Sequence, residues 1–405
     1  MRKLIFLIVA CAVFLSGCKD GSMLPKRNEI QRLEMLRVIG LDKSEDSELL
    51  KITVTSKREE GGGGNGGGNG EGKSKPKAIV LTSEGKTMFS AERKFQTYTD
   101  KEVFFGHVDY YLIGEEAAKE DLTKYIDFFT RDHEMRLDSL VFIVRGEANQ
   151  VIKKSSTSDY FIADRLDAIS KNASLLSLLG EMRILKIMGE LDQNDIFAFA
   201  IPSIKLIQRK EAISGIENQP EEDLEIDGYG IIKDFKLIGF LNRTIARGYN
   251  FIQNEVEAGT IDIIDKTGKS VAMEILGNST KIIPRVENGK VTSITIKSVF
   301  ETNIDEVHSR ENIFTEDILH YLEQQQSDQI LKDMEKCLEY AKENSADFLG
   351  VGKAVNLKHP IIWERIKDQW PTIFKDIPIM IKVESKINRT YDIREPNGYK
   401  AGGKR

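Results

Sequence analysis

The spacing of apolar residues predicts alternating strands and helices in the first half of the chain. Apolar-rich, partly alternating segments at Met35–Leu41 and Leu49–Thr55 predict an antiparallel pair around a turn at residues 43–46. The same pattern predicts later strands at 78–82, 105–113, 137–144 and 197–207, and helices at 86–95, 115–129, 163–169 and 175–191. We therefore expect a mixed α/β region here.

The second half carries the signals of antiparallel strands. Short apolar runs at 230–232 and 237–240 flank a turn. Asn288-Gly289 predicts a tight hairpin between strands at 279–286 and 290–300, because these two residues accept the left-handed backbone of such a turn. The final segment, Ile379–Ile387, alternates apolar and polar residues, which is typical of a strand with one buried face.

Helices separate this hairpin from the final strand. Thr315 is placed to cap a long helix, whose apolar stripe is formed by Ile330, Met334, Leu338 and Ala341. Pro360 is expected to begin another helix, with Trp363, Ile366 and Trp370 on one side and Pro371 at its end. The two tryptophans are read as core packing, with a partner-docking pair as the alternative.

These patterns predict a multidomain α+β fold, in which a mixed α/β region precedes an antiparallel sheet packed with long helices. The chain is divided as a leader at 1–17, an N-terminal region at 18–208, a linker at 209–225, a C-terminal α+β domain at 226–395 and a flexible tail at 396–405. The N-terminal region is expected to contain two subdomains or one, with a flexible glycine-rich insertion at 60–75.

The first eighteen residues predict export and lipidation. Arg2 and Lys3 precede a short apolar run, as in a secretory signal peptide, and Leu15, Ser16, Gly17 and Cys18 match the lipobox of bacterial lipoproteins. We expect acylation of Cys18 to hold the mature chain on the outer face of a membrane. An uncleaved anchor helix and a plain secreted protein are the alternatives.

Composition narrows the possible functions. The chain has 405 residues and a formal net charge of −6, without a basic stripe, which argues against nucleic-acid binding. Cys337 is the one cysteine expected in the mature chain besides Cys18, so no intrachain disulfide is expected. The five histidines lack zinc-ligand spacing, and we expect no metal and no cofactor.

One phosphate-loop pattern arises from composition. Residues 67–74 read Gly-Gly-Asn-Gly-Glu-Gly-Lys-Ser, but neither an apolar strand before them nor a helix after them is present in the sequence. We therefore expect no nucleotide binding.

The sequence contains no recognisable catalytic set. The segment Arg131-Asp132-His133-Glu134 is typical of a solvated charged turn, although it also suggests an acid–base cluster. We expect no enzymatic activity, and we expect either Arg131 and Asp132 or the strand with His107 to face a partner.

Short motifs in a fixed order resemble those of the Ger(x)C family of spore germination lipoproteins. They are Val38–Lys43, Gly85–Thr87, Phe105–His107, Ile113–Glu116, Phe128–Asp132, Arg136, Gly228–Gly230, Ala346–Gly352, Pro360, Trp363, Trp370, Phe374 and Ile387–Arg389. The resemblance implies a three-domain α+β lipoprotein on the outer face of the spore inner membrane, needed for nutrient-triggered germination. It also implies membrane-embedded A and B subunits as partners. Whether the C subunit contacts the germinant stays open.

Two other functions stay open at this point. A solute-binding lipoprotein of a transporter is expected to show two Rossmann-like lobes, which the antiparallel pattern of the second half fits poorly. An exported hydrolase of cortex peptidoglycan is expected to carry a recognisable catalytic set.

Overall fold

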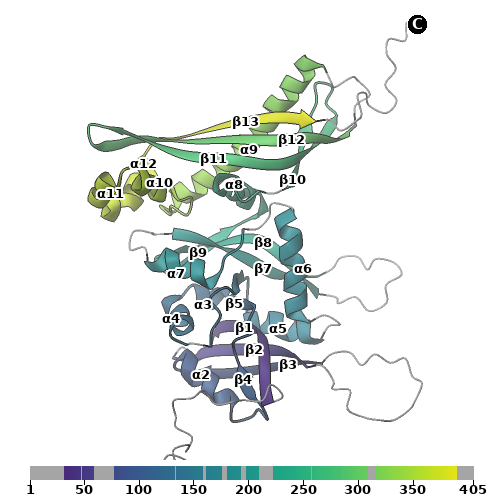
Figure 1. Cartoon of the computed structure of the whole chain (residues 1–405), viewed down its shortest axis with the longest axis vertical. Helices are drawn as coiled ribbons and strands as arrows, with labels where there is room; N and C mark the ends of the chain where they lie inside the picture. The colour runs from purple at the N-terminus through teal and green to yellow at the C-terminus, as the bar shows by residue number, and fades with distance from the viewer. Residues whose placement is uncertain are drawn as a thin grey trace, which may run out of the picture.

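The computed structural model describes residues 32–46, 48–58, 77–132, 134–157, 161–175, 180–192, 198–208, 222–256, 258–308 and 315–389. The described chain forms two sheets, which lie toward opposite ends of the long axis of the molecule (Figure 1). The α+β fold class is therefore confirmed.

The larger sheet has nine strands, β1 to β9. Their bounds are β1 Leu33–Lys43, β2 Leu50–Arg58, β3 Lys77–Gly85, β4 Glu102–Phe104, β5 Tyr110–Gly114, β6 Leu140–Val144, β7 Ala198–Gln208, β8 Glu222–Lys233 and β9 Lys236–Leu241. The order is β3-β2-β1-β5-β6-β7-β8-β9, with β4 beside β1. Strands β1, β5, β6 and β7 are parallel, whereas antiparallel pairs extend the sheet at both sides.

Helices cover both faces of the first part of this sheet. Their bounds are α2 Met88–Phe95, α3 Glu115–Ala118, α4 Thr123–Arg131, α5 Ala148–Thr157, α6 Ile162–Leu175 and α7 Ile184–Asp192. Apolar residues of α2, α4 and α7 share a core with one face, and those of α5 and α6 share a core with the other. This three-layer arrangement follows from parallel strands, which are hydrophobic on both faces.

The smaller sheet has the order β10-β11-β12-β13. Its strands are β10 Gly259–Ile264, β11 Ser270–Glu287, β12 Lys290–Val307 and β13 Ile379–Arg389. The helices of this half are α8 Arg243–Gln253, α9 Glu316–Glu343, α10 Val351–Lys358, α11 Pro360–Ile366 and α12 Trp370–Asp376. Strands β10, β11 and β12 are antiparallel, but β13 runs parallel to β12. The helices α9 to α12 form the crossover that a parallel pair requires.

Strands β7 and β8 lie between two cores. On one face, Phe199 and Ile232 join the core of the N-terminal helices, while on the other, Ala200 and Ile231 join the core of α8 and the smaller sheet. Residues 222–225 of the expected linker belong to β8, because Glu222 already pairs with Gln208 of β7. Residues 209–221 lie outside the described residues.

Three expected helices differ in their bounds. The helix expected at 115–129 is two helices, α3 and α4, because the Leu122 amide donates to the Phe235 carbonyl and the Asp121 side chain accepts from the Thr123 amide. The helix expected at 175–191 begins at Ile184 in the described part, where α7 starts. Pro371 does not end a helix, since it lies in the first turn of α12, where a missing amide costs nothing.

Candidate functional site

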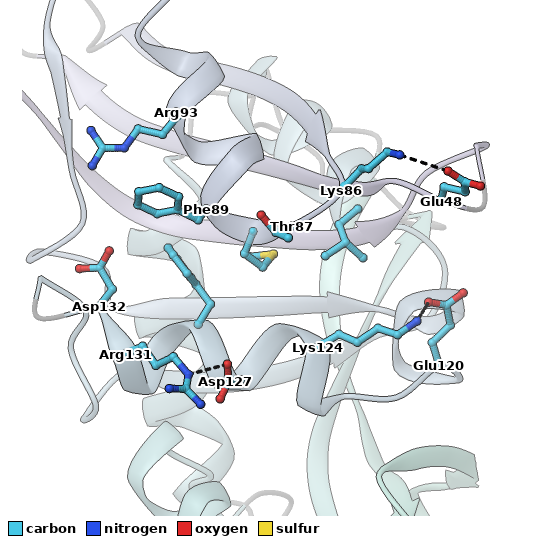
Figure 2. A pocket seen from close by; sticks show the side chains of 13 residues that line it. Glu48, Lys86, Thr87, Phe89, Arg93, Glu120, Lys124, Asp127, Arg131 and Asp132 are labelled. Carbon is cyan, nitrogen blue, oxygen red and sulfur yellow. Dashed lines mark hydrogen bonds and ion pairs between the residues drawn. The ribbon is translucent and has the colours of Figure 1, made fainter.

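A cleft of about 840 Å³ opens between α2 and α4, and Arg131 and Asp132 line it. The side chains of α2 and those of α4 face each other across this cleft (Figure 2). The structure therefore brings the two expected partner-surface residues together at one concave site. Sequence reasoning had missed the α2 side of this site.

Local sequence fixes the position of α2. The Thr87 hydroxyl accepts from the Ser90 amide and the Ser90 hydroxyl accepts from the Thr87 amide, so a capping box begins the helix. Met88 and Phe95 are buried on the sheet. Phe89, which follows Met88, therefore points away from the sheet and is 50% exposed over the cleft. A helix so anchored holds an exposed aromatic ring in a fixed place.

Most charges around the cleft are already paired. Lys86 Nζ lies 3.5 Å from Glu48 Oε2, and Lys124 Nζ lies 3.4 Å from Glu120 Oε2. Arg131 Nε donates to Asp127 Oδ2 at 2.8 Å, yet the Arg131 side chain is 76% exposed. Pairs this exposed contribute little stability, so the side chains can exchange partners at low cost.

Arg93 differs from these cations. Its guanidinium lies 4.8 Å from the centre of the Phe89 ring, and it makes no ion pair with another described residue. Figure 2 shows both side chains above the opening, facing Asp132 and Arg131. A cation stacked on an exposed ring offers a partner one apolar contact and one site for a carboxylate.

Asp132 stabilises the loop after α4. Its backbone amide donates to the Phe128 carbonyl, and its Oδ1 accepts from the Glu134 amide at 2.9 Å. Nearby, the pKa of Glu92 is raised to about 7, mainly by burial and in part by the charges of Asp132 and Glu134, against the lowering effect of Arg93. Asp132, which lines the cleft, therefore lies near two further carboxyl groups, those of Glu92 and Glu134.

His107 lies elsewhere. It is exposed in the loop between β4 and β5, so the strand expected from residue 105 begins only at Tyr110. Its ring centre lies 5.9 Å from that of Phe104, and it does not line the cleft. The lipobox residues Leu15 to Cys18, the segment 67–74 and His133 all lie outside the described residues.

Several motif residues hold the fold together. Asp42 is buried, and its carboxylate accepts from the amides of Ala148 and Asn149 at the start of α5, both at 2.8 Å. Burial raises the pKa of Asp42 to about 6 despite these hydrogen bonds. Gly40 packs against the same helix, since a Cβ there would lie 2.7 Å from Ile152 Cδ1.

Asp347 has a similar role in the C-terminal half. Its carboxylate accepts from the Val351 and Gly352 amides at 3.0 and 2.6 Å and from Trp370 Nε1 at 2.8 Å. Trp363 and Trp370 are buried and meet edge to face at 5.2 Å. The tryptophans therefore pack the core, as the sequence predicts.

The described residues offer no exposed thiol, metal cluster or membrane-spanning helix beside the cleft. Cys337 is buried on α9, and burial raises the pKa of its thiol. Within the described ranges, no group of three or more histidine, cysteine or acidic side chains is placed to hold a metal ion. Also within these ranges, no helix is both long and apolar enough to cross a bilayer.

Comparisons with known proteins agree on one family. Residues 26–206 match the spore germination protein N-terminal domain, and residues 227–391 match the spore germination B3/GerAC-like C-terminal domain.

Curated relatives match over almost the whole chain. Spore germination protein KC of Bacillus subtilis (strain 168) is 25% identical over 398 residues, covering 95% of this chain and 94% of that protein. Spore germination protein B3 of the same organism is 24% identical over 381 residues, covering 92% of this chain and 94% of that protein.

A solved structure shares the fold. The crystal structure of the GerBC protein matches with a TM-score of 0.53 at 19% identity, covering 86% of this chain and 96% of that chain.

Proposed function

We propose that this chain, which belongs to the Ger(x)C family of spore germination proteins, is the lipid-anchored C subunit of a spore germinant receptor. In this proposal Cys18 carries the lipid, the chain stands on the outer face of the spore inner membrane, and it works without catalysis beside membrane-embedded A and B subunits. The match of both family domains across the chain is the observation that carries the proposal.

We further propose that the cleft between α2 and α4 contacts another receptor subunit. Arg93 and Phe89 offer a cation and an apolar surface side by side, and the exposed pair Arg131–Asp127 lies opposite. A partner segment with one carboxylate and one apolar side chain matches this chemistry. Asp132 supports the loop that directly follows Arg131 at the end of α4.

Co-purification tests the receptor assignment. The full chain carries a C-terminal tag, dormant-spore inner membrane is solubilised gently, and mass spectrometry identifies what is recovered with it. We expect polytopic A and B subunits, and we expect Cys18→Ala to move the chain out of the membrane fraction. Recovery with a transporter permease would instead indicate a solute-binding lipoprotein.

Charge reversal tests the cleft. We expect Arg93→Glu with Arg131→Glu to lower receptor abundance or germination rate at least severalfold, because both reversals repel a partner carboxylate. The matched control is Arg365→Glu with Lys375→Glu. These substitutions reverse two exposed cations on helices outside the cleft and change the net charge by the same amount. Unchanged abundance and rate in the cleft variant would exclude the cleft as a contact surface while leaving the receptor assignment intact.

A further inference from the structure

Three lysines form a single row across the smaller sheet. Lys281 of β11 lies opposite Lys297 of β12, and Lys297 lies opposite Lys382 of β13. Neighbouring strands are about 4.8 Å apart, so the row crosses the sheet at right angles to its strands. The three side chains share one face, because they occupy paired positions.

This face is open to solvent. All three lysines are exposed, whereas Ile296, the neighbour of Lys297 that points to the other face, is fully buried in the core. None of the three makes an ion pair with another described residue. Like charges at directly opposed positions destabilise a sheet. The nearest acidic side chain on this face, Glu384, lies 3.6 Å from Lys386 Nζ and makes no ion pair with the three lysines of the row.

Two exposed apolar side chains lie directly beside the row of lysines, with a threonine between them. Ile283 pairs with Thr295, and Thr295 pairs with Met380, one step along each strand pair on the same face. Ile283 is 41% exposed and Met380 is 56% exposed. A basic row next to the exposed side chains of Ile283 and Met380 makes an amphipathic surface.

We propose that this surface binds an acidic amphipathic helix of a partner protein, laid across the strands along the row Lys281-Lys297-Lys382. Acidic residues at positions i, i+3 or i+4, and i+7 of a helix follow one another by about 5–6 Å, which matches the spacing of the strands. Apolar residues on the adjoining side of the same helix meet Ile283 and Met380. The lysines then gain anionic partners, which no other described residue supplies.

The charge pattern favours a helix over an anionic lipid surface. The same face carries Glu301, which accepts from Asn388 Nδ2, and Glu384, which lies 3.6 Å from Lys386 Nζ. A lipid surface attracts a broadly basic face. On this face, the cations without an ion pair to another described residue are confined to one line. One line of charge is the pattern that a single helix presents.

This surface is separate from the cleft. The smaller sheet occupies one end of the long axis of the molecule, and α2 with β1 to β3 occupies the other (Figure 1). The binding of a helix to the smaller sheet therefore does not depend on the cleft. A variant whose cleft is intact can still fail to bind the helix.

Binding of a defined peptide tests the proposal. The full chain is placed in neutral phosphatidylcholine nanodiscs and titrated with a labelled helical peptide of about 20 residues, with glutamates at i, i+4 and i+7 beside a leucine stripe. We expect the acidic peptide to bind, and a peptide with lysines in place of the glutamates not to bind. Added salt is expected to weaken binding.

Neutral variants locate the site. We expect Lys281→Gln, Lys297→Gln and Lys382→Gln together to weaken the dissociation constant about tenfold, the size expected for losing three exposed ion pairs. The control replaces Lys94, Lys236 and Lys332 by glutamine, which removes three exposed lysines elsewhere and should change binding less than twofold. Thermal melts verify that both variants are folded.

Three results would overturn the proposal. The first is a failure to locate peptide binding at the row, either because the acidic peptide does not bind or because both triple variants lose binding equally. The second is lysine-dependent binding of phosphatidylglycerol vesicles without binding of the peptide, which would assign the row to lipid. The third is self-association of the chain that the row variant abolishes while the peptide fails to bind, which would assign the row to a second copy.

Discussion

Replacing the middle lysine of the row by glutamate should stabilise the free protein. Lys297 lies opposite two like charges, Lys281 and Lys382, and Lys297→Glu turns both repulsive pairs into attractive ones. Cross-strand charge pairs contribute roughly 0.2–1 kcal/mol each, so the free energy of unfolding should rise by about 1 kcal/mol. Lysine and glutamate are both poor strand formers, so propensity adds little.

Scanning calorimetry measures this effect. A gain of about 1 kcal/mol corresponds to a rise in Tm of about 2–4 °C for a domain of 150–250 residues. The control is the same Lys297→Glu change in a chain that already carries Lys281→Gln and Lys382→Gln, where no charges remain opposite residue 297. There we expect no rise, and in 1 M salt we expect the rise in the parent chain to shrink.

Two results would refute the reasoning. An equal rise in Tm in the control background would mean that the row does not cause it. A fall in Tm for Lys297→Glu alone would mean that the lysines are not repelling one another. The expected outcome also separates stability from binding, because the variant should be more stable than the parent and bind the acidic peptide less well.

Two further predictions concern the core. Gly352→Ala should lower the free energy of unfolding, measured by urea titration, by about 1–3 kcal/mol, because the new Cβ would lie 2.7 Å from both Trp363 and Trp370. The control, Gly189→Ala, places a Cβ in open space on α7 and should be neutral or slightly stabilising. Equal effects of the two substitutions would argue against close packing at Gly352. The pKa of Asp42, raised from 3.8 to about 6 in the folded chain, makes its stabilising contribution complete below pH 3.8 and lost as the pH rises through 6. Asp42→Asn removes this titration, so the variant's stability relative to the parent should rise by up to about 3 kcal/mol between pH 4 and 7, and a difference independent of pH would contradict the buried carboxyl.

Local signals predicted the elements that depend on local chemistry. The hairpin at Asn288-Gly289 is confirmed, with both residues at positive φ between β11 and β12. The break between α3 and α4 was missed because it depends on a hydrogen bond to Phe235, more than a hundred residues away. Pro371 was assigned to the wrong end of a helix because proline is compatible with the first turn as well as with a stop.

The two proposed binding surfaces could not be predicted in full from the sequence either. Charge clustering drew attention to Arg131 and Asp132, but their position opposite Arg93 and Phe89 depends on how α2 packs. The lysine row could not be found from sequence, because Lys297 and Lys382 are brought together by the register of a parallel pair that α9 to α12 separate. Register between distant strands follows from the whole core and leaves no local mark.

Strands β7 and β8 carry one further consequence, which is mechanical. A sheet clamped between two hydrophobic cores resists bending, because a hinge there would have to separate buried side chains on both faces at once. The described part of the chain should therefore move as one rigid body along its length. A displacement applied to the end with α2 arrives at the end with β10 to β13 as a movement of the whole body.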